Sequence, residues 1–153
     1  MNNVKVEPFK VIGIEVRTTN ENNQAAKDIE ALWGKFMKDD ILNTIPNKTD
    51  HSVYSIYTDY EKDHTKPYTT ILGCRVDNLD NIPDGMVGQS FEGGNYVKFT
   101  PKGDLTKDLV INEWLKIWNM DLDRVFTADF EIYGEEKAKN PSDAEIDIFI
   151  AVK

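Results

Sequence analysis

Hydrophobic and polar residues alternate along several short stretches of the chain, as they do in β-strands that bury one face. In residues 9–17 the alternation places Ile12, Ile14 and Val16 on one side, and Thr70, Leu72, Cys74 and Val76 share a side in Tyr68–Val76. The same pattern predicts strands over residues 52–59, 126–133 and 145–152. Two shorter strands, 86–91 and 96–100, flank Gly93 and Gly94 and are expected to pair across a tight glycine turn.

Helical spacing of apolar residues appears twice. The first set is Ala25, Ala26, Ile29, Leu32, Trp33 and Phe36, and the second, within residues 105–119, is Val110, Trp114, Ile117 and Trp118. Asn22 or Asn23 could cap the first helix and Asp104 the second. In this prediction Trp114 belongs to the packing stripe of its helix.

The chain contains an internal repeat. A shift of 76 positions (133 − 57 = 76) lays Tyr57 on Tyr133, Ile56 on Ile132 and Val76 on Val152 without a gap. Both segments are an aromatic-rich alternating run, a polar loop and a second alternating run, so one β-hairpin is expected to be built twice. The pseudo-repeats span about 4–77 and 86–153, and the polar turn 77–85 separates them.

These elements predict an α+β fold in one domain, residues 1–153, made of two strand-helix-strand-strand units. Their strands would form one antiparallel sheet, with both helices on one face and a ligand cleft between the halves. We expect residues opposite the helices to line that cleft, and by strand parity these are Ser55, Tyr57, Ile71, Gly73, Glu131, Tyr133, Asp147 and Phe149, joined by Tyr96. Gly73 in mid-strand marks a close approach by a ligand or another backbone, or a bulge.

Composition narrows the classes of function. With 27 acidic and 18 basic residues the net charge is −9, which disfavours direct nucleic-acid binding and favours cationic ligands. The sequence contains no apolar run of membrane-spanning length and no signal-peptide core, so a cytoplasmic location without membrane contact is expected. The lone Cys74 cannot form an internal disulfide.

The sequence lacks the motifs of several common binding and catalytic sites. It has no glycine-rich phosphate loop, no Gly-x-Ser-x-Gly elbow and no Cys-x-x-Cys pair. The two histidines, His51 and His64, are too far apart for a helical metal pair, and the acidic residues Asp121 and Asp123 lack the calcium-loop pattern. No metal and no cofactor are therefore expected.

Glu131 is the candidate site residue. It stands between Phe130 and Tyr133 in one copy of the repeat, whereas the other copy has Ser55 at that position. A solvated strand glutamate is the alternative. The chain is also rich in aromatic residues, namely Trp33, Trp114, Trp118, Tyr54, Tyr57, Tyr96 and Tyr133. If some of them surround Glu131, their ring faces would each attract a cation by about 0.5–2 kcal/mol, and burial would raise the pKa of the carboxyl.

The order of several motifs resembles that of the gyrase-inhibitor-like effector-binding domains, which include integron-associated cationic-drug-binding proteins and the effector domains of multidrug-responsive transcription activators. The motifs are Phe9-Lys10-Val11-Ile12-Gly13, Leu32-Trp33-x-x-Phe36, Ile45-Pro46-Asn47-Lys48, Tyr54-Ser55-Ile56-Tyr57, Ile82-Pro83-Asp84-Gly85-Met86, Gly94-Asn95-Tyr96, Trp114-x-x-Ile117-Trp118 and Phe130-Glu131-Ile132-Tyr133. The similarity runs from about residue 4 to the end of the chain. Pro101 and Ala151 depart from the family pattern, which has a histidine and a proline there.

The resemblance implies a duplicated fold with a ligand cleft, a buried acid at Glu131 that neutralises cationic drugs and dyes, and a cleft aromatic at Tyr96. The chain is expected to be of the stand-alone type, without a DNA-binding domain. The expected ligand-binding residues are Glu131, Tyr96, Tyr57, Trp33, Trp118, Tyr133, Phe149 and Ser55.

More than one function stays open. The chain could be a small-molecule binding module, acting alone, as a homodimer or with a separate regulator protein. It could instead be a hydrolase of strained electrophiles, in which Glu131 with Tyr57 or Tyr96 acts as general acid and base. Inhibition of a protein such as gyrase is suggested by the family name, but no residue pattern supports it.

Overall fold

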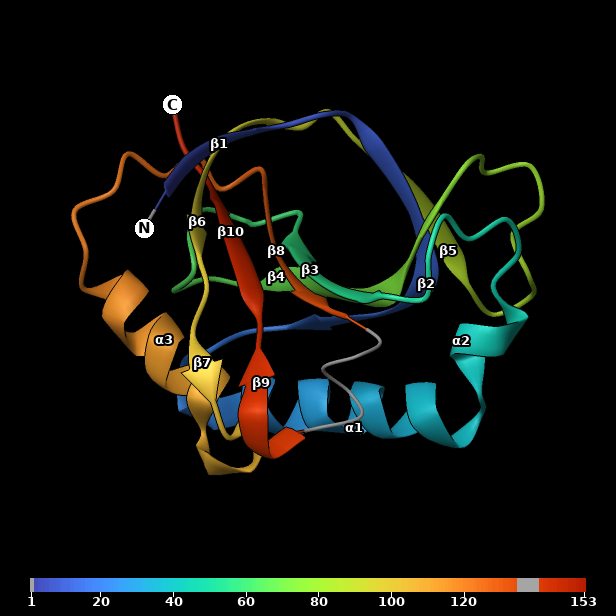
Figure 1. Ribbon diagram of the computed structural model, residues 1–153, viewed down its shortest axis with the longest axis horizontal. Helices are drawn as coiled ribbons and strands as arrows, with labels where there is room; N and C mark the ends of the chain where they lie inside the picture. Colours follow the sequence, from blue (N-terminus) through green and yellow to red (C-terminus); the bar gives the residue numbers. More distant parts are fainter. Residues whose placement is uncertain (1, 135–140) are drawn as a thin grey trace.

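One curved antiparallel sheet carries the fold in the computed structural model, which describes residues 2–134 and 141–153 (Figure 1). Within these ranges the sheet has eight strands in the order β1-β6-β10-β8-β3-β4-β2-β5. The strands are β1 (Asn2–Val6), β2 (Phe9–Thr18), β3 (Val53–Thr58), β4 (Tyr68–Val76), β5 (Val87–Phe91), β6 (Gly94–Phe99), β8 (Ala128–Tyr133) and β10 (Asp147–Ala151). The short strands β7 (Lys102–Gly103) and β9 (Ala144–Glu145) pair separately. The α+β prediction is confirmed.

The two halves meet at the centre of the sheet. There β3 and β8 pair antiparallel with Ser55 opposite Glu131, and these are the residues that the 76-position shift makes equivalent. The two hairpins β3–β4 and β8–β10 extend outward from this pair on either side.

The outer strands cross from one half to the other. Strand β1 pairs with β6, and β5 pairs with β2, so the predicted hairpin between residues 86–91 and 96–100 is wrong. Gly93, at φ +75°, lies against the backbone of β1, where a β-carbon would approach the carbonyl oxygen of Val6 to 2.1 Å. The glycine therefore serves a close approach between backbones and not a tight hairpin turn.

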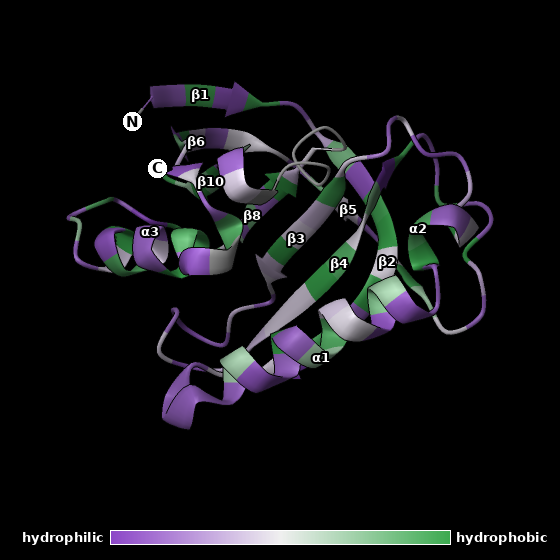
Figure 2. Ribbon diagram, turned by 60° about the horizontal axis from the view of Figure 1, so that its bottom comes forward, coloured by the Kyte–Doolittle hydropathy of each residue, from purple (hydrophilic) through white to green (hydrophobic). Residues whose placement is uncertain are grey.

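The helices α1 (Gln24–Lys38) and α3 (Leu109–Trp118) lie on the same face of the sheet (Figures 1 and 2), and the short α2 (Ile41–Thr44) follows α1. Helix α1 begins where the apolar spacing predicts, although Asn23 makes no capping side-chain hydrogen bond. Helix α3 begins later than predicted. A 3-10 turn, Leu105–Lys107, and Asp108 in the left-handed region precede it, so Asp104 is not its N-cap.

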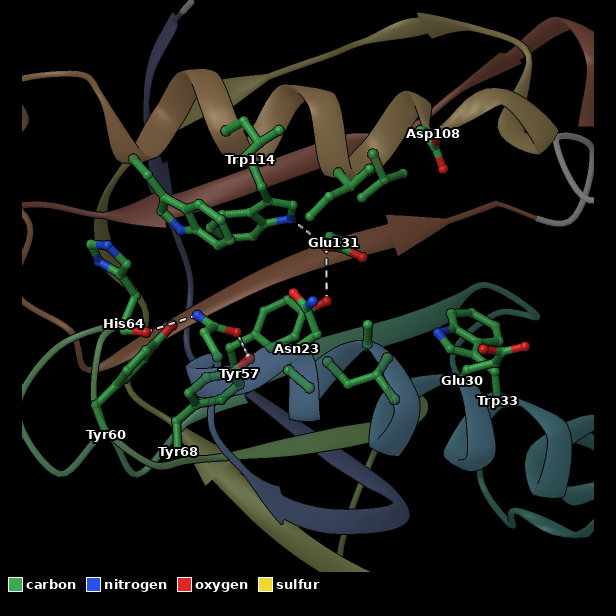
Figure 3. Close-up of a pocket in the computed structure, with 18 of the residues that line it drawn as sticks. Asn23, Glu30, Trp33, Tyr57, Tyr60, His64, Tyr68, Asp108, Trp114 and Glu131 are labelled. Atoms are coloured by element: carbon green, nitrogen blue, oxygen red, sulfur yellow. Dashed lines mark hydrogen bonds between the residues drawn. The ribbon is translucent and has the colours of Figure 1, made fainter.

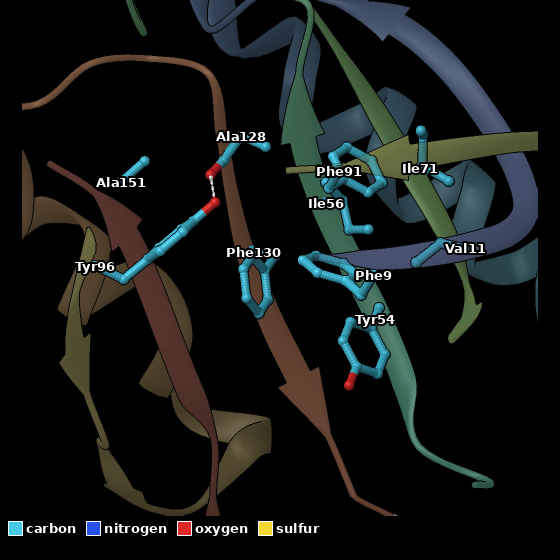
Figure 4. Packing of buried hydrophobic residues seen from close by; sticks show 10 residues of the cluster. All are labelled: Phe9, Val11, Tyr54, Ile56, Ile71, Phe91, Tyr96, Ala128, Phe130 and Ala151. Atoms are coloured by element: carbon cyan, nitrogen blue, oxygen red, sulfur yellow. Dashed lines mark hydrogen bonds between the residues drawn. The ribbon is translucent and has the colours of Figure 1, made fainter. Parts of the chain in front are cut away.

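Hydrophobic clusters cover both faces of the sheet. Beneath α1, Leu32 and Phe36 pack on the strand residues Ile12, Ile14, Leu72 and Cys74, and beneath α3, Ile117 packs on Ile146, Ile148 and Ile150. The third cluster lies on the opposite face and is rich in rings (Figure 4); it consists of Phe9, Val11, Tyr54, Ile56, Ile71, Phe91, Tyr96, Ala128, Phe130 and Ala151. The face expected to hold the cleft is thus a packed core.

The expected cleft lining combined side chains from both faces. Ser55 pairs with Leu72, and Glu131 pairs with Ile148, so Ser55 and Glu131 share the helix side of the sheet with these core residues. Ile71, Gly73, Asp147 and Phe149 alternate with those partners and therefore face the other way. Alternation assigns faces within one strand, but only the pairing register relates the faces of two strands.

Gly73 approaches a backbone. It pairs with Gly13, and a β-carbon on Gly73 would lie 2.2 Å from the carbonyl oxygen of Ile12 and 2.8 Å from the Cα of Gly13. Of the alternatives given for this glycine, close packing of neighbouring backbones is therefore the one that the fold requires. Among the described residues, no helix is long and apolar enough to span a bilayer.

Candidate functional site

A cavity of about 810 Å³ lies between α1 and α3, above strands β3 and β8 (Figure 3). Its walls and floor are Asn20, Asn23, Ala25, Ala26, Ile29, Glu30, Trp33, Tyr57, Tyr60, His64, Tyr68, Leu105, Asp108, Val110, Ile111, Trp114, Leu115, Trp118, Arg124, Glu131 and Tyr133. The volume is in the range of small-molecule sites in proteins, and so is the mainly apolar and aromatic lining.

The placement of the two helices leaves this space open. Helix α1 packs over β2 and β4, whereas α3 packs over β6 and β10, so the central pair β3–β8 has no helix above it. The wall residues Ala25 and Ala26 of α1 have short side chains, and on α3 the side chains of Ile111 and Leu115 are 45% and 47% exposed. The cavity is therefore wide and apolar toward its mouth.

Glu131 lies on the floor of this cavity with only 1% of its surface exposed. Its Oε2 accepts hydrogen bonds from the Tyr57 hydroxyl at 2.9 Å and from Trp114 Nε1 at 2.6 Å, while its Oε1 accepts one from the Tyr133 hydroxyl at 2.6 Å. All three donors are neutral. Burial raises the pKa of the Glu131 carboxyl above its ordinary value, and the three hydrogen bonds offset part of that rise.

Ser55 supports the floor from below. It is fully buried, does not line the cavity, and donates a hydrogen bond of 3.2 Å to the Tyr57 hydroxyl. Tyr57 in turn donates to Glu131, so the serine opposite the glutamate helps to orient one of its donors. Burial and the nearby Glu131 carboxylate raise the pKa of Tyr57 well above its ordinary value, which keeps the phenol protonated.

Aromatic rings enclose the space above the carboxylate. Trp33 meets Tyr133 edge to face with ring centroids 5.0 Å apart, and Tyr57 meets Trp114 in the same way at 5.5 Å. At the other end His64 stacks on Trp118 with centroids 5.4 Å apart. Such walls offer π faces to a cationic or aromatic guest.

A second buried carboxylate, Asp129, lies two residues before Glu131 on the same face of β8, and it has a cationic partner. Its Oδ2 forms an ion pair with the guanidinium of Arg124 at 2.8 Å and accepts a hydrogen bond of 2.7 Å from the Tyr60 hydroxyl. Its Oδ1 accepts the backbone N–H of Ala151 at 2.8 Å. The charge of Asp129 is thus neutralised by Arg124, whereas the donors to Glu131 among the described residues are all neutral.

The predicted site residues divide into three groups. Glu131, Tyr57, Tyr133, Trp33 and Trp118 all line the cavity. Ser55 lies just beneath it. Tyr96 and Phe149 are on the opposite face of the sheet, where the Tyr96 hydroxyl donates to the carbonyl oxygen of Ala128 at 2.8 Å (Figure 4), so their expected place in the cleft is wrong.

Several residues that line the cavity were not predicted from the sequence. Trp114 was assigned to packing, yet its indole N–H makes a 2.6 Å hydrogen bond to Glu131. Its position on the same stripe as Trp118 was the available signal. Tyr60, His64 and Tyr68 come from the β3–β4 hairpin, and no periodic pattern indicates that a charged loop folds over a cavity. Within residues 2–134 and 141–153, no group of three or more His, Cys, Asp or Glu side chains could hold a metal ion.

The chain matches a described protein family and a solved structure along nearly its whole length. Residues 4–152 match the family model described as integron-associated effector binding protein. An integron cassette protein from the mobile metagenome of Vibrio cholerae has a similar crystal structure, with a TM-score of 0.75 and 34% identity over 99% of this chain and 95% of that one.

Two further proteins are similar along nearly their whole length. The structure of SAV2435 bound to tetraphenylphosphonium has a TM-score of 0.81 at 12% identity, over 99% of this chain and 93% of that one, which shows a shared fold. YobU of Bacillus subtilis (strain 168), assigned provisionally as a transcriptional regulator, is 28% identical over 145 residues, which are 92% of this chain and 90% of that protein.

Proposed function

The chain belongs to the integron-associated effector binding proteins, and from that membership we propose that it binds lipophilic cations in the cavity between α1 and α3. The observation that carries the proposal is the state of Glu131. The residue is 1% exposed and borders a cavity of about 810 Å³, and within the described part of the chain its carboxylate has three neutral donors and no cationic partner.

The physical argument rests on the cost of that charge. A buried carboxylate without a counter-ion is expensive to ionise, and a cation in the cavity would compensate it. The rings of Trp33, Tyr57 and Tyr133 add cation–π attraction and apolar contact. An anion would meet the Glu131 charge and is disfavoured, while a neutral ligand would leave that charge uncompensated.

Relatives support the chemical class and the biological setting. SAV2435 was solved with tetraphenylphosphonium, a lipophilic cation, and YobU is provisionally a regulator. We therefore include in the proposal that ligand occupancy is sensed in transcription regulation, with a separate regulator or a second copy of the chain as partner. A cytoplasmic setting is part of the same proposal.

The test compares methyltriphenylphosphonium with triphenylphosphine oxide, which has the same three rings and an oxygen in place of the methyl group but no net charge, by isothermal titration calorimetry. We expect saturable binding of the cation and weak binding of the oxide. Glu131→Gln should weaken cation binding about 10- to 100-fold, because it removes a charged partner worth about 1.5–3 kcal/mol. Glu92→Gln, which removes an exposed charge outside the cavity, is the matched control. Equal affinities for all three proteins would refute the proposal.

Hydrolysis of a strained electrophile is the second candidate, because a carboxyl with a raised pKa shares a hydrogen bond with Tyr57 in an enclosed site. The assignment of Tyr96 to this chemistry fails, since Tyr96 is on the other face. Mass analysis after incubation with a reactive cyclopropane tests the candidate. Product formed equally by the wild type and Glu131→Gln would remove the catalytic assignment.

A further inference from the structure

The charged groups that line the cavity are distributed unevenly along it. Apart from His64 and the tyrosines, four of the described lining residues have acidic or basic side chains, namely Glu30, Asp108, Arg124 and Glu131. Arg124 lies at the end occupied by His64, with its Nη1 3.5 Å from His64 Nδ1, and Asp129 neutralises it. Glu30 beside Trp33 on α1 and Asp108 at the start of α3 lie on the Trp33 side of Glu131 (Figure 3).

Among the described residues, the carboxylates of Glu30 and Asp108, here called the rim carboxylates, have no partner. Both side chains are exposed, and within the described part of the chain neither makes a hydrogen bond or an ion pair. Glu30 lies on α1 and Asp108 directly precedes α3, and these two helices face each other across the cavity. Among the described lining residues, three therefore have carboxylates, while the arginine, Arg124, is already neutralised by Asp129.

We propose that the preferred ligands of this cavity are aromatic dications, with one positive group at Glu131 and a second between Glu30 and Asp108. The inference rests on the proposed function, since it takes a first cation at Glu131 as given. The inference specifies that the ligand has two positive charges, and it specifies the orientation of the ligand. The second positive group points toward Trp33 and away from Arg124. The aromatic part of the ligand occupies the cavity between Glu131 and the rim carboxylates. Aromatic rings and the apolar side chains of α1 and α3 form the walls there.

The general charge of the protein offers a competing explanation. A net charge of −9 attracts any dication more than a monocation, wherever the charges are placed. Local recognition differs in two ways. It depends on Glu30 and Asp108 and not on other exposed acids, and it depends on the spacing of the two ligand charges.

The experiment uses N-alkylquinolinium compounds whose alkyl chain of three to six carbons ends either in trimethylammonium or in the isosteric, uncharged tert-butyl group. Calorimetry gives the dissociation constants of both compounds, and their ratio, for the wild type, Glu131→Gln, Glu30→Gln with Asp108→Asn, and the control Glu7→Gln with Asp84→Asn. The control removes two exposed carboxylates that do not line the cavity, so both double variants have the same net charge.

We expect the dication to bind about 3- to 10-fold more tightly than its isostere at low salt in the wild type and in the control, because an exposed ion pair contributes about a 2- to 5-fold gain. In the Glu30 and Asp108 variant the ratio should fall to about 1 to 2. The gain should peak at one chain length and decline with added salt.

The possible results distinguish a failure of the dication inference from a failure of the proposed cation binding at Glu131. If the monocation binds in a Glu131-dependent manner but the dication gains nothing, or gains equally in both double variants, the second-charge inference is wrong and the proposed function stands. If neither compound depends on Glu131, the proposed function itself fails.

Discussion

Ser55 and Glu131 face each other across the β3–β8 pair, and they are also the two residues made equivalent by the internal repeat (55 + 76 = 131). The other β3–β8 pairs, such as Val53 with Tyr133 and Tyr57 with Asp129, join positions that are not equivalent. A local twofold axis therefore passes between Ser55 and Glu131. Because the sequence differs at that point, the cavity has one carboxylate at its centre where exact symmetry would place two.

The uncompensated charge of Glu131 predicts that Glu131→Gln stabilises the ligand-free protein. Folding raises the pKa of this carboxyl, so the folded protein becomes less stable as the pH rises above the pKa that the carboxyl has in the unfolded chain. At pH 7 the variant with a neutral glutamine should therefore be more stable than the wild type. We expect a gain of about 1 kcal/mol, or about 3 °C in Tm. Thermal unfolding should show the gain shrinking as the pH falls and Glu131 becomes protonated. A lower Tm at pH 7 would contradict this.

Binding of a cation should depend on pH through the same group. In the free protein the pKa of Glu131 is raised above its ordinary value of 4.5, so protonation competes with the cation as the pH falls from neutral toward 4.5. Affinity for tetraphenylphosphonium should therefore decrease with falling pH, and binding should release protons. Calorimetry in buffers of different ionisation enthalpy measures that release. Glu131→Gln should show neither effect, and a pH-independent wild type would refute the assignment.

Trp114→Phe should raise the pKa of Glu131 further, because the indole N–H lowers it through a 2.6 Å hydrogen bond. Trp118→Phe, which reduces the area of a wall ring but removes no hydrogen bond to Glu131, is the matched comparison. Both variants lose ring area, so both should weaken cation binding, Trp114→Phe by about 5-fold or more. Only Trp114→Phe should shift the pH midpoint of binding upward. An equal shift in both would mean that the indole hydrogen bond has no electrostatic role.

Two tyrosine variants test which face of the sheet holds the site. Tyr57→Phe removes a 2.9 Å hydrogen bond to Glu131 and should weaken cation binding about 3- to 10-fold. Tyr96→Phe removes a buried bond to the carbonyl oxygen of Ala128, which should cost about 1 kcal/mol of stability and leave affinity unchanged. Titration and urea unfolding of both proteins give the two quantities. If only Tyr96→Phe lost affinity, the binding site would lie on the face of the sheet opposite the helices, and our assignment would be wrong.

Two glycine-to-alanine changes should have opposite effects on stability. In Gly73→Ala the new methyl group would meet the Ile12 carbonyl oxygen at 2.2 Å, so we expect a loss of about 3 kcal/mol or more. In Gly34→Ala, inside α1, a β-carbon has no neighbour within 4 Å, and helix propensity should add about 0.5–1 kcal/mol. Urea denaturation measures both free energies. Similar changes in the two proteins would show that the Gly13–Gly73 contact is not constrained.

The sequence predicted elements well because periodicity is a local property. The alternation around Ile146, Ile148 and Ile150 and the helical stripe through Leu32 and Phe36 each identify a buried face without knowledge of the rest of the chain. Glu131 stood out for a similar reason, as a charge in an aromatic strand where the equivalent residue is serine.

Relations between elements were harder to predict. The register that turns Ser55 toward Leu72, and so toward the helices, is set by pairing and not by alternation. The role of Trp114 could not be separated from packing, because a buried ring and a ring that donates to a buried carboxylate have the same spacing on a helix. Strand β1 escaped prediction because its residues are mostly exposed and polar.

The crossing of β1 and β5 affects how this protein can fold. Neither pseudo-repeat contains every strand of its own half of the sheet, because each supplies the outermost strand of the other. An isolated repeat would leave the outer edge of β2 or of β6 unpaired, with its backbone amides and carbonyls open to water or to another chain. The two pseudo-repeats are thus mutually dependent, and cleavage in the turn between them should yield fragments that are stable only when recombined.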